Sequence, residues 1–119
     1  MVGSNLAMVD RQILVLDRDC VDVDVFSNID NFVSYMGYPS LSVIDNLFVV
    51  DAYGYAYDLQ VNDETLIPIS REMSKKEREY VIITVQKYLN IHGINCIIYS
   101  SASINLLIEK ITNIKEITY

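Results

Sequence analysis

The sequence predicts a single α+β domain, residues 1–119, in which helices pack on a mostly antiparallel sheet. Three observations lead to this fold class: strand-length apolar runs gather in the first half, helical spacing dominates the second, and no linker or repeat divides the chain. A chain of 119 residues is about one domain and can bury a core without disulfide or metal support. The hydrophobic content of 51% is typical of folded protein.

Two strands and a short helix are expected first. Ile13–Leu16 is an apolar run of strand length, and Val21–Val25 alternates valine with aspartate, so that three valines share one face. Ser27 is predicted to cap a helix whose apolar residues recur at i, i+3, i+4 and i+7 within Ile29–Met36. Gly37 is expected to end this helix.

A β-hairpin is predicted over Leu47–Val61 because two runs rich in β-branched and aromatic residues flank a turn signal. The turn, Asp51–Gly54, has Asp first and Gly fourth, as a type I turn prefers. Thr65–Ile69 is expected to add a strand, which Pro68 confines to an edge of the sheet because proline lacks the N–H group.

The second half is predicted to contain two helices and two strands. Ser74–Leu89 opens with a capping box, Ser-Lys-Lys-Glu, and is expected to be the longest helix. Ile94–Tyr99 is a continuous apolar run, typical of a strand covered on both faces. Ile104–Ile111 repeats the helical spacing, and Ile114–Tyr119 is expected to be a closing strand, which gives a C-terminal β-α-β unit. Two or three helices in all would pack on the sheet.

Charge is distributed very unevenly along the chain. Residues 1–66 contain eleven of the sixteen acidic residues but only two basic ones, whereas residues 67–119 contain five acidic and seven basic residues. The two halves therefore carry about −9 and +2 at neutral pH. An acidic surface on a folded domain suits a basic partner and repels phosphates, so we expect no direct binding to nucleic acid or to an anionic membrane.

Catalytic signatures are scarce. The only histidine, His92, stands at the end of the long predicted helix, where a cation suits the helix dipole. Cys20 and Cys96 lie far apart, so one histidine and two cysteines give no zinc-ligand set of the usual spacing. No phosphate loop, dinucleotide fingerprint or Gly-x-Ser-x-Gly elbow occurs. We therefore expect a protein that is not an enzyme and needs no cofactor.

The candidate binding residues are carboxylates and one tyrosine. They fall in the first acidic run and in the hairpin: Asp17, Asp19, Asp22, Asp24, Asp51, Tyr53 and Asp58. The acidic run does not fit a calcium loop, because the sixth and twelfth positions lack the required glycine and glutamate. It can be a partner-facing patch or simply the solvated face of an alternating strand.

Tyrosines are the second unusual feature of the hairpin. Tyr53, Tyr55 and Tyr57 cluster beside two aspartates, a combination that suits a protein interface. Tyr55 and Tyr57 share a face with Leu59, so either the core or an interface can hold them. Tyr53, at the tip of the turn, is expected to be exposed.

Cytoplasm is the expected compartment. The apolar runs are far shorter than the roughly 18–20 residues of a transmembrane helix, and two unpaired-looking cysteines suit a reducing environment. Residues 1–8 lack the features of a secretory signal and are expected to be a disordered or added leader, with Met8 as the true start.

One stretch resembles a known family. A short helix within Phe26–Tyr35 leads into Ser42-Val-Ile-Asp-Asn-Leu-Phe-Val-Val-Asp-Ala-Tyr-Gly-Tyr-Ala-Tyr-Asp-Leu. This arrangement resembles small bacterial immunity proteins of contact-dependent inhibition and related polymorphic toxin systems, over about residues 20–61. Tyr55 stands where those proteins often carry Arg or Lys. The resemblance implies a non-catalytic protein that covers the active site or substrate surface of one cognate toxin, often a nuclease.

Two hypotheses follow for the function. The first is a cytoplasmic immunity protein that binds and neutralises a toxin domain, expected to be a basic nuclease. The second is a small non-enzymatic adaptor or ligand-binding module, in which the hairpin and Ile94–Tyr99 frame a pocket. The sequence leaves the oligomeric state open.

Overall fold

The computed structural model describes residues 11–37 and 41–118. Its elements follow the chain as β1 (Ile13–Asp17), β2 (Asp22–Phe26), α2 (Ile29–Met36), α3 (Leu41–Asp45), β3 (Leu47–Asp51), β4 (Tyr55–Asn62), β5 (Thr65–Glu72), α4 (Lys75–Ile91) and α5 (Ile104–Thr118). The five strands form one sheet in the order β2-β1-β3-β4-β5, and every neighbouring pair is antiparallel. The α+β fold class is therefore confirmed.

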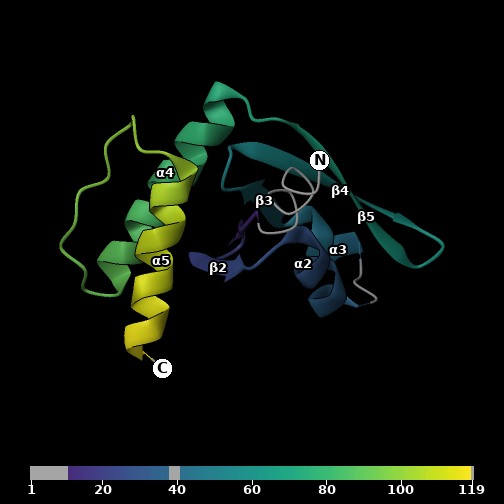
Figure 1. Ribbon diagram of the computed structural model, residues 1–119, viewed down its shortest axis with the longest axis horizontal. Helices are drawn as coiled ribbons and strands as arrows, with labels where there is room; N and C mark the ends of the chain where they lie inside the picture. Colours follow the sequence, from purple (N-terminus) through teal and green to yellow (C-terminus); the bar gives the residue numbers. More distant parts are fainter. Residues whose placement is uncertain (1–10, 38–40, 119) are drawn as a thin grey trace, which may run out of the picture.

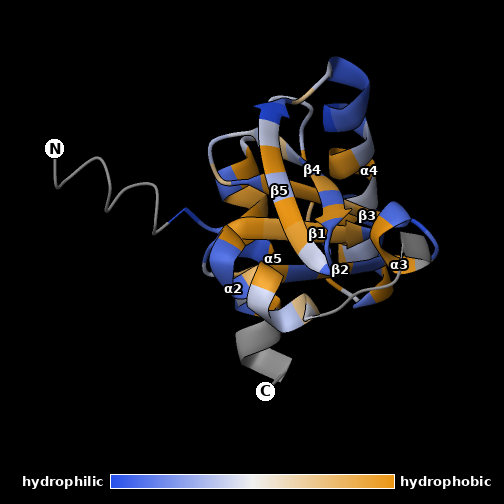
Figure 2. Cartoon of the chain, turned by 90° about the vertical axis from the view of Figure 1, so that its right-hand side faces the viewer, coloured by the Kyte–Doolittle hydropathy of each residue, from blue (hydrophilic) through white to orange (hydrophobic). Residues whose placement is uncertain are grey.

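Helices cover both faces of the sheet, as Figure 1 shows, with α4 and α5 on one side and α2 and α3 on the other. Because side chains alternate along a strand, Leu14 and Leu16 of β1 join the core under α4 and α5, and Ile13 and Val15 join the core under α2 and α3. β1 is buried on both faces for this reason. The strands carry much of the hydrophobic colour in Figure 2, whereas the start of α4 is hydrophilic.

The hairpin of β3 and β4 is confirmed, with its turn. The N–H of Gly54 donates to the carbonyl of Asp51 at 3.0 Å, which closes the turn, and Gly54 has φ +92°, a conformation that glycine adopts readily. β3 and β4 pair only at Val49–Tyr57 and Val50–Ala56, so the strands diverge beyond these residues. β5 is an edge strand and contains Pro68, as predicted.

Local capping explains the helix starts. Ser74 and Glu77 form the predicted capping box of α4, with both reciprocal hydrogen bonds present. The cap of α2 differs from the prediction: Asn28, not Ser27, is the N-cap, and its side chain accepts from the N–H of Asn31 at 2.9 Å. Both residue types accept at a helix start, so the sequence pattern alone does not distinguish them. Gly37, with φ +61°, ends α2 as expected.

The predicted C-terminal β-α-β unit is wrong. Residues 94–99 form no strand in the structure, and residues 114–118 continue α5 instead of starting a strand. Ile114 lies three residues after Ile111 and is buried like it, so the apolar helical spacing simply extends. α3 was not predicted, and it brings the number of helices in the described residues to four. The expectations for residues 1–8 and for Tyr119 fall outside the described residues.

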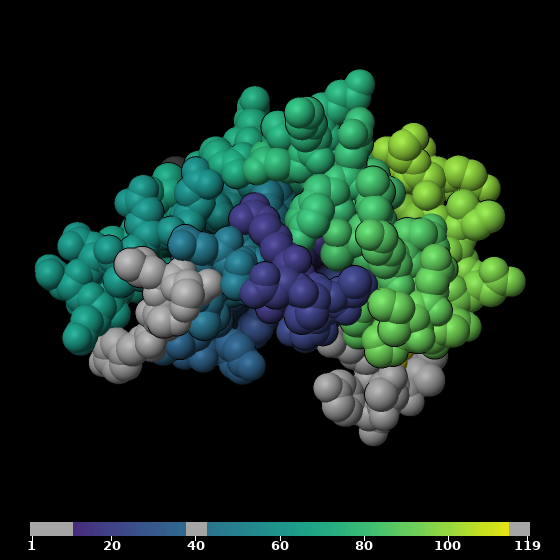
Figure 3. All heavy atoms as spheres, turned by 180° about the vertical axis from the view of Figure 1, so that it is seen from behind, coloured from purple at the N-terminus to yellow at the C-terminus, as the bar shows by residue number. Residues whose placement is uncertain are grey.

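The β1–β2 pair lies near the middle of one face of the molecule, as Figure 3 shows. In the view from behind, these residues lie between the β4–β5 hairpin and the loop that follows α4, whereas the start of α4 is joined to β5 by the Arg71–Glu77 ion pair (Figure 3). β2 is the second edge strand, and the turn that joins it to β1 is exposed. The most acidic stretch of the sequence thus lies at an exposed edge of the sheet.

Candidate protein-binding surface

Four of the predicted binding residues meet at the β1–β2 turn. Asp17 ends β1 and lies opposite Asp22 in the antiparallel register, so the turn brings their backbones together. Asp22 and Asp24 share one face of β2 and are both exposed, because Val23 and Val25 occupy the face that packs under α4 and α5. Asp19 is exposed in the turn itself. We call Asp17, Asp19, Asp22 and Asp24 the acidic turn.

Hydrogen bonds fix the shape of the acidic turn. The carboxylate of Asp17 accepts from the N–H of Asp19 at 2.9 Å, and the carboxylate of Asp19 accepts from the side-chain amide of Asn46 at 2.6 Å. The N–H of Arg18 donates to the carbonyl of Asn46 at 2.7 Å. These contacts tie the turn to the junction between α3 and β3, where Asp45 adds an exposed carboxylate that the sequence reasoning missed.

The thiol of Cys20 reports the electrostatics of this turn. Its pKa is raised from its ordinary value, first by loss of hydration and then by the neighbouring carboxylates of Asp17, Asp22 and Asp19. Nearby negative charge disfavours a thiolate, since the two would repel. The acidic turn is therefore a place where a negative charge is unwelcome and a positive one is attracted.

Asp51 lies elsewhere and is fully buried. Its carboxylate accepts from the N–H groups of Tyr53 and Tyr55 at 2.9 and 3.1 Å. It also accepts from the hydroxyl of Tyr57 at 2.9 Å and from the guanidinium of Arg11 at 3.0 Å. A side chain with this burial cannot touch a partner directly, so it acts on the surface only through the turn that it shapes.

The three hairpin tyrosines have different environments. Tyr53 is 59% exposed, as expected, and the guanidinium of Arg11 lies over its ring at 4.3 Å from the centroid. Tyr55 is also exposed, whereas Tyr57 is half-buried and packs against the core under α2 and α3. Burial, followed by the hydrogen bond to Asp51, raises the pKa of Tyr57. Tyr57 is thus mainly structural.

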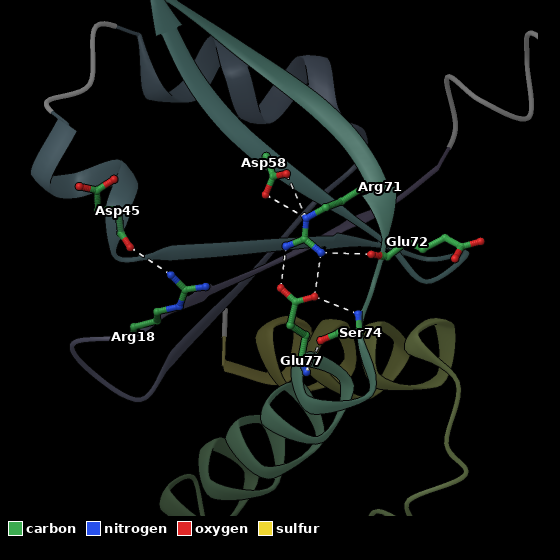
Figure 4. Close-up of polar contacts among 7 residues, drawn as sticks. All are labelled: Arg18, Asp45, Asp58, Arg71, Glu72, Ser74 and Glu77. Carbon is green, nitrogen blue, oxygen red and sulfur yellow. Dashed lines mark hydrogen bonds and ion pairs between the residues drawn. The ribbon is translucent and has the colours of Figure 1, made fainter.

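Asp58 belongs to an ion-pair network on the α4 side of the sheet (Figure 4). Nε of Arg71 donates to both carboxylate oxygens of Asp58 at 3.0 Å, and its two terminal nitrogens donate to Glu77 at 2.7 and 2.6 Å. The network joins β4, β5 and α4. The hydrogen bonds from Arg71, and further ones from Ser74, lower the pKa of Glu77 to about 2.

The predicted residues therefore lie in three separate places. The acidic turn follows the end of β1, whereas Asp51 pairs with Ile13 at the start of β1, so Asp51 and Tyr53 lie at the opposite end of the sheet. Asp58 points to the α4 side, the face opposite the one that carries Asp22 and Asp24. Asp51 and Tyr53 are therefore remote from the acidic turn, whereas Asp58 lines the same cleft as Arg18 of the turn and Asp45.

A polar cleft of about 190 Å³ opens where β3 and β4 diverge. Arg18, Asp45, Asp58 and Arg71 contribute to its lining, so it contains both signs of charge. This volume is smaller than the roughly 300–1,000 Å³ of the pockets that usually hold drug-sized ligands. The pocket expected between the hairpin and residues 94–99 is not supported by these positions, because the hairpin lines this cleft and residues 94–99 line hollows beside α5.

Within the described residues, the other side chains that could bind a metal ion or take part in catalysis form no further candidate site. His92 caps the C-terminus of α4 and its ring contacts that of Tyr88 at 4.3 Å between centroids. Within residues 11–37 and 41–118, no three His, Cys, Asp or Glu side chains are placed to share a metal ion. In the same residues, no helix has both the length and the apolar character needed to cross a membrane. Comparisons with protein-family models, curated proteins and solved structures give no match.

Proposed function

We propose that this protein is an immunity protein that binds and neutralises a basic toxin domain, for which a nuclease is the best candidate. The observation that carries the proposal is the acidic turn: four carboxylates at one exposed edge of the sheet. The resemblance of residues 20–61 to immunity proteins supports the same function. That the protein is not an enzyme and needs no cofactor remains a prediction from the sequence.

The acidic turn suits a cleft that normally binds phosphates. Carboxylates held at fixed positions can occupy places where a nuclease would hold substrate phosphates, and the same charges speed the encounter with a basic surface. The bonds from Asp17 to Asp19 and from Asp19 to Asn46 hold the turn before any partner arrives. Such preorganisation lowers the entropy that binding would otherwise cost.

The proposed contact is confined to the acidic turn and the adjacent Asp45. Tyr53 was predicted as a further contact, but a partner that reached it as well would have to extend along the sheet to the opposite end of β1. Asp58, which was also predicted, lines the same cleft as Arg18 and Asp45. Asp58 is also already paired with Arg71, so its use by a partner would disrupt the link to α4. Both stay predictions of the sequence.

The test uses the genetic neighbourhood, because immunity genes stand beside the genes of their toxins. If the gene directly upstream encodes a large secreted protein with a variable C-terminal domain, that domain is the candidate partner. We expect the full chain to form a stable complex with that domain in isothermal titration calorimetry and to abolish its activity at an equimolar ratio. A domain that is toxic yet is neither bound nor inhibited would show that the proposal is wrong.

A further inference from the structure

The loop between α4 and α5 exposes large apolar side chains. Ile97 is 72% and Tyr99 71% exposed, whereas Cys96 and Ile98 pack against the core. The loop arches along the outer side of the two helices (Figure 1). Large apolar side chains that gather at one place on the surface of a folded protein mark a binding site more often than scattered ones do. The loop is therefore a candidate binding surface.

Hydrogen bonds fix the conformation of this loop. The amide Nε2 of Gln86 donates to the carbonyl of Cys96 at 2.7 Å, and its Oε1 accepts from the N–H of Ile98 at 2.8 Å. The N–H of Ala102 donates to the carbonyl of Tyr99 at 3.0 Å. The surface that the loop presents is thus formed before any ligand arrives, which lowers the entropy that binding would cost.

A hollow of about 460 Å³ lies between this loop and the first turns of α5. Its volume is within the roughly 300–1,000 Å³ of the pockets that usually hold drug-sized ligands. Most of the described residues that line it are apolar, and they come from both elements: Ile97, Ile98, Tyr99, Ala102 and Leu106. Among the described residues of the lining, Lys110 is the only charged one.

Lys110 is half-buried beside this apolar lining. Its Nζ donates to the sulfur of Cys96 at 3.1 Å, which holds the ammonium group against the loop. A thiol sulfur is a weak acceptor and carries no compensating charge. Among the side chains that the structure describes, no carboxylate forms an ion pair with Lys110. A partly buried charge is unfavourable without a partner of opposite sign, so an anionic group suits this place.

We propose that the hollow binds a medium-chain fatty acid, with its carboxylate on Lys110 and its apolar chain over Ile97, Tyr99 and Leu106. The ammonium group would donate a charge-assisted hydrogen bond to the carboxylate. The chain would cover apolar side chains that are otherwise exposed, which is favourable by about 25 cal/mol per Å² of apolar surface buried. A fully polar anion lacks the second contribution, and a neutral amphiphile lacks the first.

Charge favours a free fatty acid over a membrane surface. The hollow lies in the half of the chain that carries about +2, so a single anion meets little repulsion there. An anionic bilayer would face the whole chain, whose net charge is −7. The inference goes beyond the proposed function, because no residue of the acidic turn lines the hollow. Fatty-acid binding and toxin binding can therefore be measured separately.

Titration of the isotopically labelled full chain with octanoate, followed by NMR, tests the site. We expect saturable shifts of the amide signals of Ile97, Tyr99 and Leu106. 1-Octanol should bind at least about tenfold more weakly, because it lacks the charge that pairs with the ammonium group. No saturable shifts, or shifts confined to Leu89 and Ile114 in a smaller hollow of about 210 Å³, would overturn the proposal.

Three variants test the contacts. Lys110→Gln should weaken octanoate binding at least about tenfold and leave octanol binding unchanged, which also shows that the hollow is intact. Lys87→Gln removes the same charge from an exposed position on α4 and should bind octanoate like the original chain. Leu106→Asp places a like charge in the hollow and should abolish octanoate binding. Equal effects of the two lysine substitutions, or octanoate binding that survives Leu106→Asp, would contradict the proposal.

Discussion

Among the single residues, Asp51 combines complete burial with four hydrogen bonds, two to backbone N–H groups and two to the side chains of Arg11 and Tyr57. Asp51→Asn keeps the shape but removes the charge and turns one acceptor into a donor that faces other donors. We expect the free energy of unfolding to fall by about 2–4 kcal/mol, the usual range when a buried charged partner is lost. Urea denaturation followed by circular dichroism measures this change.

Asp22→Asn is the matched control for that substitution. Asp22 is exposed, and within residues 11–37 and 41–118 its carboxylate accepts only from the neighbouring N–H of Val23, which can also donate to an asparagine oxygen. Its effect should stay within about 0.5 kcal/mol. If Asp51→Asn is equally mild, the hairpin turn does not depend on the buried carboxylate.

Cys20 offers a residue-scale probe of the acidic turn that needs no partner. Its raised pKa leaves little thiolate near neutral pH, so alkylation by neutral iodoacetamide should be slow although the thiol is exposed. Asp22→Asn should accelerate the reaction about two- to fivefold, because it removes one of the charges that disfavour the thiolate. Mass spectrometry of the Cys20 peptide measures the rate.

Asp30→Asn provides the comparison for the thiol experiment. Asp30 is an exposed aspartate in the first turn of α2 and is not among the groups that shift the Cys20 thiol. It should leave the alkylation rate unchanged. An equal acceleration by both substitutions would mean that overall charge, rather than the geometry of the turn, controls the thiol.

At the scale of elements, Glu77 links the start of α4 to β5 through Arg71. Its pKa is lowered from 4.5 to about 2, first by the hydrogen bond from Arg71 and further by those from Ser74. A carboxylate with a lowered pKa stabilises the fold fully above its unfolded-state value and loses that contribution as the folded form is protonated. The free energy of unfolding should therefore fall as the pH drops from about 4.5 toward 2.

Glu77→Gln removes this part of the pH dependence. We expect about 1–2 kcal/mol less stability at neutral pH, a figure reduced for the partial exposure of the pair, and a flatter acid limb. Urea denaturation at a series of pH values below 5 measures both. Glu79→Gln, on the exposed side of the same helix, should keep the original slope, and a wild-type slope in Glu77→Gln would exclude Glu77 as its source.

Elements whose signals are local were predicted well. The capping box of α4 and the Asp51–Gly54 turn depend only on nearby residues, so they could be read directly. Residues 94–99 could not, because a short and mostly apolar run does not show whether a partner strand exists. In the structure an amide side chain from α4 takes the place of that partner.

Only the part of the candidate site that depends on local sequence signals was predicted. The acidic turn could be found because strict alternation of valine with aspartate shows which face is exposed. The burial of Asp51 could not, since its partner Arg11 lies forty residues earlier in the chain. The link from Arg71 to Asp58 likewise depends on the pairing of β4 with β5.

At the scale of the whole molecule, the fold places acidic and basic residues on different parts of the surface. The sequence shows only that they fall in different halves of the chain. The acidic turn lies at one exposed edge of the sheet, whereas Lys75 and Lys76 lie at the exposed start of α4. Arg78, which also lies near this helix start, donates to the backbone carbonyls of Ser100 and Ala102 and so holds the α4–α5 loop. Only the two lysines are therefore a suitable basic control.

The most direct test of the proposed function is the association rate with the proposed toxin domain, measured by stopped-flow fluorescence over a range of salt concentrations. Asp22→Lys combined with Asp24→Lys should slow association at least about tenfold and flatten its salt dependence, whereas Lys75→Glu combined with Lys76→Glu should change the rate by less than about twofold. Circular dichroism confirms that each variant is folded. The opposite ranking, with the lysines dominant and the acidic turn indifferent, would contradict binding through the acidic turn.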